Sequence, residues 1–294
     1  MDFRLTDDQR ALRTGVRELL ARRFDATALR AAVDGGGLDR DLWRALGEAG
    51  FFALRLPEEA GGVGLGLPEA VLVFEEAGRA LLPGPLIATH LAAGSVDGAA
   101  EGETVVTEPD GGLVEWLEEA DVVRGDVTGA EPIRSADPLT PLHRLPGGGD
   151  GGPPERALLT AAEQLGSAGR TTAMAVQHAR QREQFGQPIG TFQAVKHLCA
   201  QMLVRTEVAR AAVYAAAVTG DPVEIAGAKL LADEAAVRCA RDCLQVHGGM
   251  GFTWEAEVHL HLKRAWLRRE RWMTTAPAQE RLAAALEEAL EEAM

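Results

Sequence analysis

The sequence has few cysteines and no long apolar run. No segment holds about 20 consecutive apolar residues, so a membrane-spanning helix is not expected. The first residues, MDFRLTDDQR, are charged from the second position and lack the apolar stretch of a secretory signal. The three cysteines, Cys199, Cys239 and Cys243, are too few for a disulfide framework. These absences predict a soluble, cytoplasmic protein.

Positive charge is also scarce. The 294 residues include 30 Lys and Arg against 44 Asp and Glu, which gives a net charge of −14. A protein that binds nucleic acid normally presents a basic face, so that class is not expected. Aromatic residues make up only 5% of the chain and hydrophobic residues 46%, a composition that favours Ala- and Leu-rich helices over a β-sandwich.

Helical patterns over residues 1–95 predict an N-terminal helical domain. Thr6 precedes two acidic residues and an amphipathic run, so it is expected to cap a helix. A second amphipathic helix is expected in RDLWRALGEAGF. After a glycine-rich loop, a third helix begins near Pro68, and Pro83 and Pro85 end it.

The pattern changes over residues 96–153, where Gly, Pro and short apolar runs such as ETVVT and DVVRGDV dominate. With strands of about 5–6 residues, this segment has room for about three to five strands. It closes on PGGGDGGPP, which is typical of a flexible linker. The segment is thin for an independent β-domain, so a reduced middle segment is expected here.

Long helical runs return over residues 154–294, and the first of them is expected to continue to Phe185. Gly220 ends one helix, and Asp221 with Pro222 begins the next. Long helices joined by short loops predict an antiparallel bundle. The predicted fold class is therefore mainly α, with an N-terminal helical domain, a shrunken middle segment of strands or loop, and a C-terminal helical bundle.

The stretch RQREQFGQPIGTFQAVKH interrupts this helical region. The first helix breaks at Phe185, and Thr191 is placed to cap the next one, with Phe192 and Gln193 in its first turn. A helix N-terminus beside an arginine, here Arg182, suits a phosphate group. A helix corner with a structural arginine is the other interpretation, and the residues taken alone favour it.

A second stretch, QVHGGMGFTWE, follows a later helix. Its adjacent glycines, Gly248 and Gly249, would let a ligand approach the backbone closely. Such turns also end many helices, so the pattern is weak evidence of a site when it is taken alone.

Together, RxxFGxxIGxFQAVxH and QVHGGMGFTWE resemble the two hallmark segments of the acyl-CoA dehydrogenase family. MDFRLTDDQRALR resembles the family's first helix, and GFFALRLPEEAGGVGLGLPEAVLVFEEAGRALLPGP resembles its substrate-side loop and helix. The resemblance covers residues 1–95 and 154–275 in the family's order. It implies an N-terminal helical domain, a middle β-domain and a C-terminal four-helix bundle.

The resemblance also implies an activity, the FAD-dependent removal of two hydrogens across Cα–Cβ of an acyl-CoA thioester. In the family a Glu takes the α-proton and the flavin N5 takes the β-hydride, so the cofactor does the redox chemistry while the protein supplies base and orientation. The hallmark segments hold the adenine and pyrophosphate end of an FAD bound in the neighbouring subunit. The resemblance assigns the pyrophosphate contact to Arg182. The other cofactor-binding candidates are Gln184, Phe185, Phe192, Gln193, Gln245, Val246, His247, Gly248 and Gly249.

Two departures from the family pattern bear on function. The middle segment lacks the family's Trp followed by Ser or Thr, and its one tryptophan, Trp116, is expected in a helix turn or an edge strand. The usual position of the catalytic Glu falls on Trp272, which cannot abstract a proton. The less common position falls on Arg156, and Glu155 beside it is about 100° away around the helix. No catalytic residue is therefore assigned to this chain.

These departures imply the smaller subunit of a heteromeric member, similar to the α2β2 assemblies of actinobacterial-type steroid degraders. The larger acyl-CoA dehydrogenase subunit would supply the flavin domain and the Glu, and a steroid side-chain acyl-CoA is the implied substrate. Two alternatives stay open. One is a non-catalytic scaffold without cofactor contact, and the other is a homomeric dehydrogenase that uses Glu155 as its base.

Several other side chains are expected to be structural. Cys239, Cys243 and His247 share one helix face, but zinc sites usually take four ligands from two segments, so core packing is expected and no metal is assigned. His259 and His261 are expected to point to different helix faces, each packed or solvated.

Charge and position give expectations for one more histidine, a basic run and the acidic C-terminal end. His197 is expected either near the FAD wall or on a helix surface. The run KRAWLRRERW predicts a basic helix that contacts acidic patches of a partner or lies at the surface. The acidic end LEEALEEAM predicts a solvated helix end.

Overall fold

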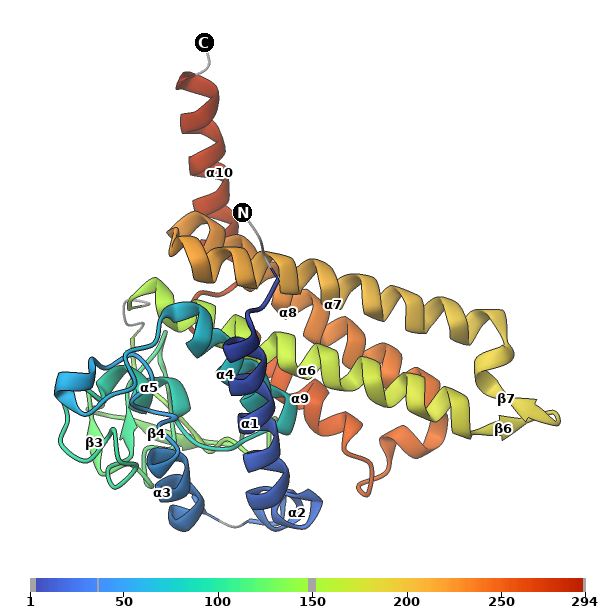
Figure 1. Ribbon diagram of the computed structural model, residues 1–294, viewed down its shortest axis with the longest axis horizontal. Helices are drawn as coiled ribbons and strands as arrows, with labels where there is room; N and C mark the ends of the chain where they lie inside the picture. Colours follow the sequence, from blue (N-terminus) through green and yellow to red (C-terminus); the bar gives the residue numbers. More distant parts are fainter. Residues whose placement is uncertain (1–3, 36, 148–151, 293–294) are drawn as a thin grey trace.

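The computed structural model describes residues 4–35, 37–147 and 152–292, and these residues are mainly helical (Figure 1). The α-helices are α1 (Asp7–Arg23), α2 (Ala26–Val33), α3 (Arg40–Glu48), α4 (Leu67–Ala80), α5 (Leu86–Ala92), α6 (Pro154–Gln181), α7 (Gln193–Thr219), α8 (Pro222–His247), α9 (Val258–Arg269) and α10 (Thr275–Glu292). Three 3-10 turns are η1 (Glu58–Ala60), η2 (Ile189–Thr191) and η3 (Gly248–Phe252). The strands are β1 (Val106–Thr107), β2 (Leu113–Glu115), β3 (Val122–Val123), β4 (Glu131–Ile133), β5 (Leu142–Arg144), β6 (Glu183–Gln184) and β7 (Gln187–Pro188).

The predicted helix starts are confirmed where the caps are polar. The Thr6 hydroxyl accepts a hydrogen bond from the Gln9 N–H at 3.1 Å, and the Gln9 side chain accepts one from the Thr6 N–H at 3.0 Å. This reciprocal capping box satisfies two backbone donors at the start of α1. Asp221 caps α8 in a similar way, since its carboxylate accepts from the N–H groups of Val223 and Glu224.

Two short helices near the N-terminus were missed. Helix α2 begins directly after α1, because the Asp25 carboxylate accepts hydrogen bonds from the N–H groups of Thr27 and Ala28. Helix α5 begins directly after Pro85, which was expected only to end a helix. A proline lacks an N–H, so it ends one helix and is equally well tolerated at the start of another.

Helices α6, α7, α8 and α9 form the C-terminal bundle, and α4 packs against α6 from the N-terminal side. The contact between α4 and α6 depends on two glycines. A Cβ on Gly166 would lie 1.9 Å from the Glu75 carbonyl oxygen, and one on Gly78 would lie 2.0 Å from the Glu163 carbonyl oxygen. The two helix backbones therefore approach each other where neither carries a side chain.

Helix α10 projects away from the rest of the molecule (Figure 1). Of its described residues only Ala278 is buried, and the acidic residues toward its end are exposed. The predicted solvated helix end is confirmed as far as residue 292; residues 293–294 lie outside the described part of the chain. No helix in the described ranges combines the length and apolar character needed to cross a membrane.

The described part of the middle segment contains five very short strands. Strands β1 and β3 pair in parallel, and β2, β5 and β4 form a small antiparallel sheet in that order. Trp116 was expected in a helix turn or an edge strand, and the structure places it in neither. It lies one residue beyond the edge strand β2, buried, with a φ of 57° and its N–H donating to the Pro141 carbonyl at 3.0 Å. Of the predicted linker, residues 148–151 lie outside the described residues.

We expect Gly166→Ala to destabilise the protein strongly, because the added methyl group would meet the backbone of α4. Overpacking of this kind lowers the free energy of unfolding by about 3 kcal/mol or more. Gly15→Ala is the matched control, since a Cβ on this exposed residue of α1 meets nothing within 4 Å. It should leave stability equal or raise it by about 0.5–1 kcal/mol. Urea unfolding measures both, and equal effects would contradict the role given to the glycine crossing.

Candidate functional site

The two hallmark segments meet at one end of the bundle. The first lies between the end of α6 and the start of α7, and the second follows the end of α8 (Figure 1). The rings of His178 on α6 and His247 on α8 stack at 4.1 Å between centroids, with 21° between their planes. Segments about 60 residues apart in the sequence therefore contribute to one surface.

A tight hairpin follows α6, which was expected to continue to Phe185. Helix α6 ends at Gln181, and β6 and β7 pair across a turn formed by Phe185 and Gly186, with φ values of 54° and 77°. Two central residues with positive φ are the signature of a type I′ hairpin turn. Phe185 is 92% exposed at the tip, and its ring meets that of Phe192 edge-on at 6.1 Å.

Helix α7 begins without the predicted cap. Thr191 lies in the 3-10 turn η2, one residue before the N-cap position, and its hydroxyl donates to the Pro188 carbonyl at 2.7 Å. Phe192 occupies the N-cap position, and no side chain caps the first turn that begins at Gln193. This 27-residue helix therefore presents uncapped N–H groups at an exposed end.

Arg182 lies at the exposed end of α6, at the C-cap position. Within the described residues its guanidinium makes no hydrogen bond or ion pair. An exposed, unpaired arginine and an uncapped helix N-terminus at the same end of the bundle are both suited to an anionic group. Gln184 is exposed as well, with its side chain donating to the Glu183 carbonyl at 2.7 Å.

The second segment offers an open backbone. Gly248 has a φ of 61°, and a Cβ on Gly249 would meet nothing within 4 Å. Gln245 is exposed, and His247 is half-buried with Nδ1 2.8 Å from the Cys243 carbonyl. Val246 is buried in the core, so only its backbone is available to a ligand.

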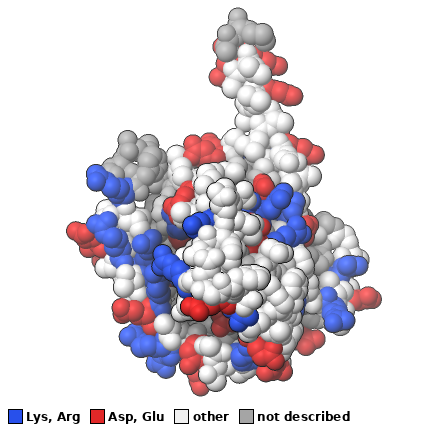
Figure 2. Space-filling view, turned by 90° about the vertical axis from the view of Figure 1, so that its right-hand side faces the viewer, with Lys and Arg blue, Asp and Glu red and all other residues white. Residues whose placement is uncertain are grey.

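Exposed apolar side chains surround these residues. Phe185, Met250 and Phe252 are 92%, 63% and 74% exposed, and Trp254 follows in the same segment. Figure 2 views this end of the molecule and shows an uncharged area bordered by charged side chains. Apolar groups gathered on one exposed face mark an interaction surface.

Arg156 and Trp272, the two positions on which the family's base was expected to fall, lie in contact with each other. The Arg156 guanidinium lies 4.7 Å from the centroid of the Trp272 ring, and the Arg271 guanidinium lies 5.0 Å from that ring. Trp272 is 3% exposed, and its backbone N–H donates to the Asp110 carboxylate at 2.5 Å. A cation and an indole therefore pack together at the two positions where a base was expected.

Two buried carboxylates complete this cluster. Glu108 pairs with Arg156, and Asp110 pairs with Arg271 at 3.1 Å. Burial raises the pKa of both carboxyl groups, while the paired arginines oppose the shift. Raised pKa values are also a feature of catalytic bases, but the cavity that Trp272 lines measures about 20 Å³. That volume holds about one water molecule and no acyl thioester.

Glu155 lies on a different face of α6 from Arg156. Its carboxylate accepts two hydrogen bonds from the Arg55 guanidinium, at 3.0 and 3.1 Å, and its side chain is 37% exposed. The predicted separation of the two neighbours is confirmed. Glu155 is therefore held by a cation outside the cluster around Trp272.

Comparison with known proteins gives the same family from two regions of the chain. The acyl-CoA dehydrogenase N-terminal domain matches residues 6–100, and the C-terminal domain of the same family matches residues 154–270. The acyl-CoA dehydrogenase IpdE2 of Mycobacterium tuberculosis is 38% identical over 295 residues, which cover 88% of this chain and 91% of IpdE2. This chain belongs to the acyl-CoA dehydrogenase family.

Solved structures of this family share the fold. The ChsE4-ChsE5 complex of Mycobacterium tuberculosis contains a chain with a TM-score of 0.83 and 25% identity, and the match covers 98% of this chain and 99% of that one. A variant of Tcur3481-Tcur3483, described as a steroid ACAD, matches with a TM-score of 0.83 and 23% identity over 97% of this chain and 99% of that one.

The basic run of this acyl-CoA dehydrogenase homologue was expected at a partner contact or at the surface, which holds for the exposed Arg269 but is wrong for three other arginines. Arg264, Arg268 and Arg271 are all buried. Their partners are Asp137, Glu163 and Asp110 of the same chain. The local charge pattern shows an excess of cations but not the buried anions that face them. The acids that were overlooked are Asp110 and Asp137 of the middle segment and Glu163 of α6.

Two of the histidines and two of the cysteines pack in the core. His261 is fully buried with Nδ1 2.8 Å from the Ser167 hydroxyl, and His259 is buried against Trp254, with ring centroids 5.1 Å apart. Packing, not solvation, is therefore confirmed for both. Cys239 and Cys243 are fully buried, as core packing predicted. His197 is exposed on α7, and the described ranges hold no cluster of three or more potential metal ligands.

We expect Arg264→Met to lower the free energy of unfolding by about 3–5 kcal/mol, because it leaves the carboxylate of Asp137 buried without its cation. Lys263→Met, one residue away, is the control. Lys263 is only half-buried and contacts the Trp254 ring at 4.8 Å, so its loss should cost less than about 1 kcal/mol. Urea denaturation distinguishes the two, and a small effect of Arg264→Met would show that the pair is not a structural lock.

Proposed function

We propose that this chain is the smaller subunit of a heteromeric, FAD-dependent acyl-CoA dehydrogenase of α2β2 type. The complex removes hydrogens across Cα–Cβ of an acyl-CoA thioester. The larger acyl-CoA dehydrogenase subunit supplies the catalytic glutamate and holds the flavin ring. This chain supplies the wall against the adenine and pyrophosphate end of that FAD, and it carries no catalytic residue.

The observation that carries the proposal is the stack of Arg156 on Trp272. Both positions that the family uses for a base are occupied by side chains that cannot take a proton from carbon at neutral pH. Both are also committed to a buried cluster with Glu108 and Asp110. A chain of this family without a base needs a partner that supplies one.

The open end of the bundle fits the phosphate side of a dinucleotide cofactor. Arg182 is exposed without a partner in the described residues, the N-terminus of α7 is uncapped, and the backbone at Gly249 is open. These groups, together with Gln184, would bind and orient the pyrophosphate by charge and by N–H donation. When bound, FAD supplies the hydride acceptor of the reaction.

The remaining cofactor-binding candidates form the apolar and amide part of the proposed wall. Phe185 at the hairpin tip and Phe192 at the start of α7 lie edge to face, where an adenine ring could pack. The candidates from the second segment are Gln245, Val246, His247 and Gly248. The ring of His247 is oriented within this chain by its stack on His178 and by the Cys243 carbonyl, 2.8 Å from its Nδ1.

The relatives support a partner and a substrate class. One solved relative is described as a complex of two named chains, ChsE4 and ChsE5, and another as a steroid ACAD. We therefore propose a steroid side-chain acyl-CoA as the substrate of the complex. Co-expression of this chain with the adjacent larger dehydrogenase chain, followed by native mass and flavin absorbance, tests the assembly. About one FAD per pair of chains in a heterotetramer supports it, and stoichiometric FAD on this chain alone would refute it.

Two alternatives give different outcomes. A scaffold homologue would assemble with the same partner, but its Arg182 would have no effect on FAD. A homomeric dehydrogenase would hold FAD by itself and would depend on Glu155, which is instead paired with Arg55. The exposed and unpaired state of Arg182 favours the cofactor role over the scaffold.

We expect Arg182→Ala to weaken FAD retention in the complex by about 10- to 100-fold, the loss expected for a hydrogen bond to a charged group. Assembly with the larger subunit should persist. Arg180→Ala is the matched control, because Arg180 is an exposed arginine on the last turn of α6. FAD release is followed by flavin fluorescence during dilution. Equal retention in both variants would remove Arg182 from the FAD site.

We expect Glu155→Gln to leave the turnover of the complex within about twofold, because the change removes only a partly exposed ion pair worth about 0–1 kcal/mol. Steady-state kinetics with an acyl-CoA and an artificial electron acceptor measure it. Arg55→Gln, which breaks the same pair from the other side, is the control. A fall of several orders of magnitude in Glu155→Gln alone would identify this residue as the base.

A further inference from the structure

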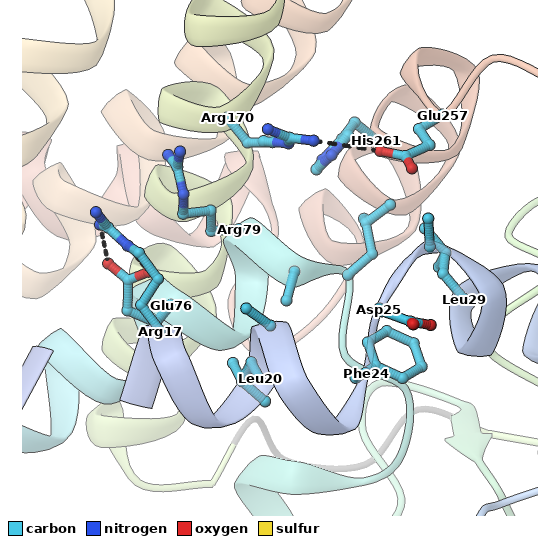
Figure 3. A pocket seen from close by; sticks show the side chains of 14 residues that line it. Arg17, Leu20, Phe24, Asp25, Leu29, Glu76, Arg79, Arg170, Glu257 and His261 are labelled. Carbon is cyan, nitrogen blue, oxygen red and sulfur yellow. Dashed lines mark hydrogen bonds and ion pairs between the residues drawn. The ribbon is translucent and has the colours of Figure 1, made fainter. Parts of the chain in front are cut away.

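A second cleft lies between α1, α2, α4, α6 and α9, and none of the candidate FAD residues lines it (Figure 3). Its volume is about 220 Å³. Three arginines from three different helices, Arg17, Arg79 and Arg170, contribute to its lining. Sites for drug-sized ligands measure about 300–1,000 Å³, so this cleft suits a small molecule.

Two of these arginines have partners and one does not. Arg17 pairs with Glu76 at 2.5 Å, and Arg170 pairs with Glu257 at 3.4 Å. Within the described residues Arg79 makes no hydrogen bond or ion pair, although it is half-buried. Burial lowers the pKa of Arg79, and the positive charge of Arg17 adds to the effect. Arg79 is therefore a desolvated cation whose surroundings favour an incoming anion.

The carboxylates around Arg79 are all engaged elsewhere. Asp25, which lines the cleft, accepts hydrogen bonds from the first turn of α2. Glu75, one turn before Arg79 on α4, is held by Arg210 and by the Tyr214 hydroxyl at 2.7 Å. Burial lowers the pKa of His261 well below its usual value, so this side chain adds no charge at neutral pH. Glu76 and Glu75 oppose the lowering of the Arg79 pKa through space, but their carboxylates pair with Arg17 and Arg210 and form no ion pair with Arg79 in the described residues.

The opposite side of the cleft is mainly apolar, with the exposed carboxylate of Asp25 at its edge. Leu20, Phe24 and Leu29 are buried side chains that line it from α1 and α2. Figure 3 shows them across the cleft from Arg79 and Arg170. A cleft with cations on one side and an apolar wall on the other fits a ligand that has both an anionic and an apolar end.

We propose that this cleft binds a small organic carboxylate. The carboxylate pairs with Arg79, between Arg17 and Arg170, and the apolar body of the ligand packs against Leu20, Phe24 and Leu29. An inorganic anion would leave the apolar wall unused, and a neutral analogue would leave Arg79 unpaired. None of the candidate FAD residues contributes to this site.

The test uses benzoate as the probe, with benzamide and inorganic phosphate as comparisons. Calorimetric titration is done on the full chain, with the larger subunit bound if the two purify together. Saturable binding of one benzoate per chain is expected, with benzamide and phosphate each weaker by at least about tenfold. Equal binding of benzamide would overturn the role of Arg79, and equal binding of phosphate would overturn the organic class of the ligand.

Two variants locate the site. Arg79→Gln should weaken benzoate binding by about tenfold or more, whereas Arg238→Gln, at an exposed arginine on α8, should not change it. Ala21→Trp keeps the charges and fills the mouth of the cleft from the exposed face of α1, so it should abolish binding even if Arg79→Gln fails to fold. Unchanged benzoate binding in Ala21→Trp would overturn the proposal. FAD content should stay constant in every variant, which separates this site from the FAD wall.

Discussion

The fold depends on buried ion pairs between the reduced middle segment and the helices that follow it. Glu108, Asp110 and Asp137 come from the middle segment, and each meets an arginine from α6, α9 or the turn after α9. The strands of this segment are two or three residues long, too short to form a stable sheet alone. Because an unpaired buried charge costs several kcal/mol, each carboxylate has only one acceptable position. The ion pairs thus specify where a segment with little regular structure must lie.

The same pairs determine the chemistry that the chain can perform. Arg156 and Arg271 hold the ring of Trp272 from two directions, and the cavity beside it accommodates about one water molecule. A residue in this cluster could become a base only if its arginine were removed, and that would expose the buried carboxylates to an unfavourable environment. The interactions that stabilise this region and those that would make it catalytic therefore exclude each other.

The elements that could be predicted from the sequence are those with local signals. The long helices, the Thr6 cap, the Asp221 start and the buried cysteines follow from patterns within a few residues. The β6–β7 hairpin was missed because Phe185 adopts a positive φ that side chains other than glycine or asparagine rarely take. The predicted cap at Thr191 is wrong because Thr191 belongs to the 3-10 turn η2, so α7 begins one residue later, with Phe192 at the N-cap position.

The candidate site divides in the same way. Its hallmark residues are recognisable by resemblance, and their sequence order places them on loops between helices. The fate of Arg264, Arg268 and Arg271 depends on acids up to 161 residues away, as in the pair of Asp110 with Arg271. No local pattern encodes such a distance, and the cleft around Arg79 likewise draws on five helices.

The hairpin tip carries one further implication. Phe185 holds a bulky ring in a backbone conformation that costs about 1–3 kcal/mol, and water surrounds nearly all of that ring. No contact within the described residues offsets the cost of this backbone conformation or buries the ring. Contact of this ring with a surface outside the chain would offset part of that cost, so the tip is better suited to an intermolecular contact than to isolation in water.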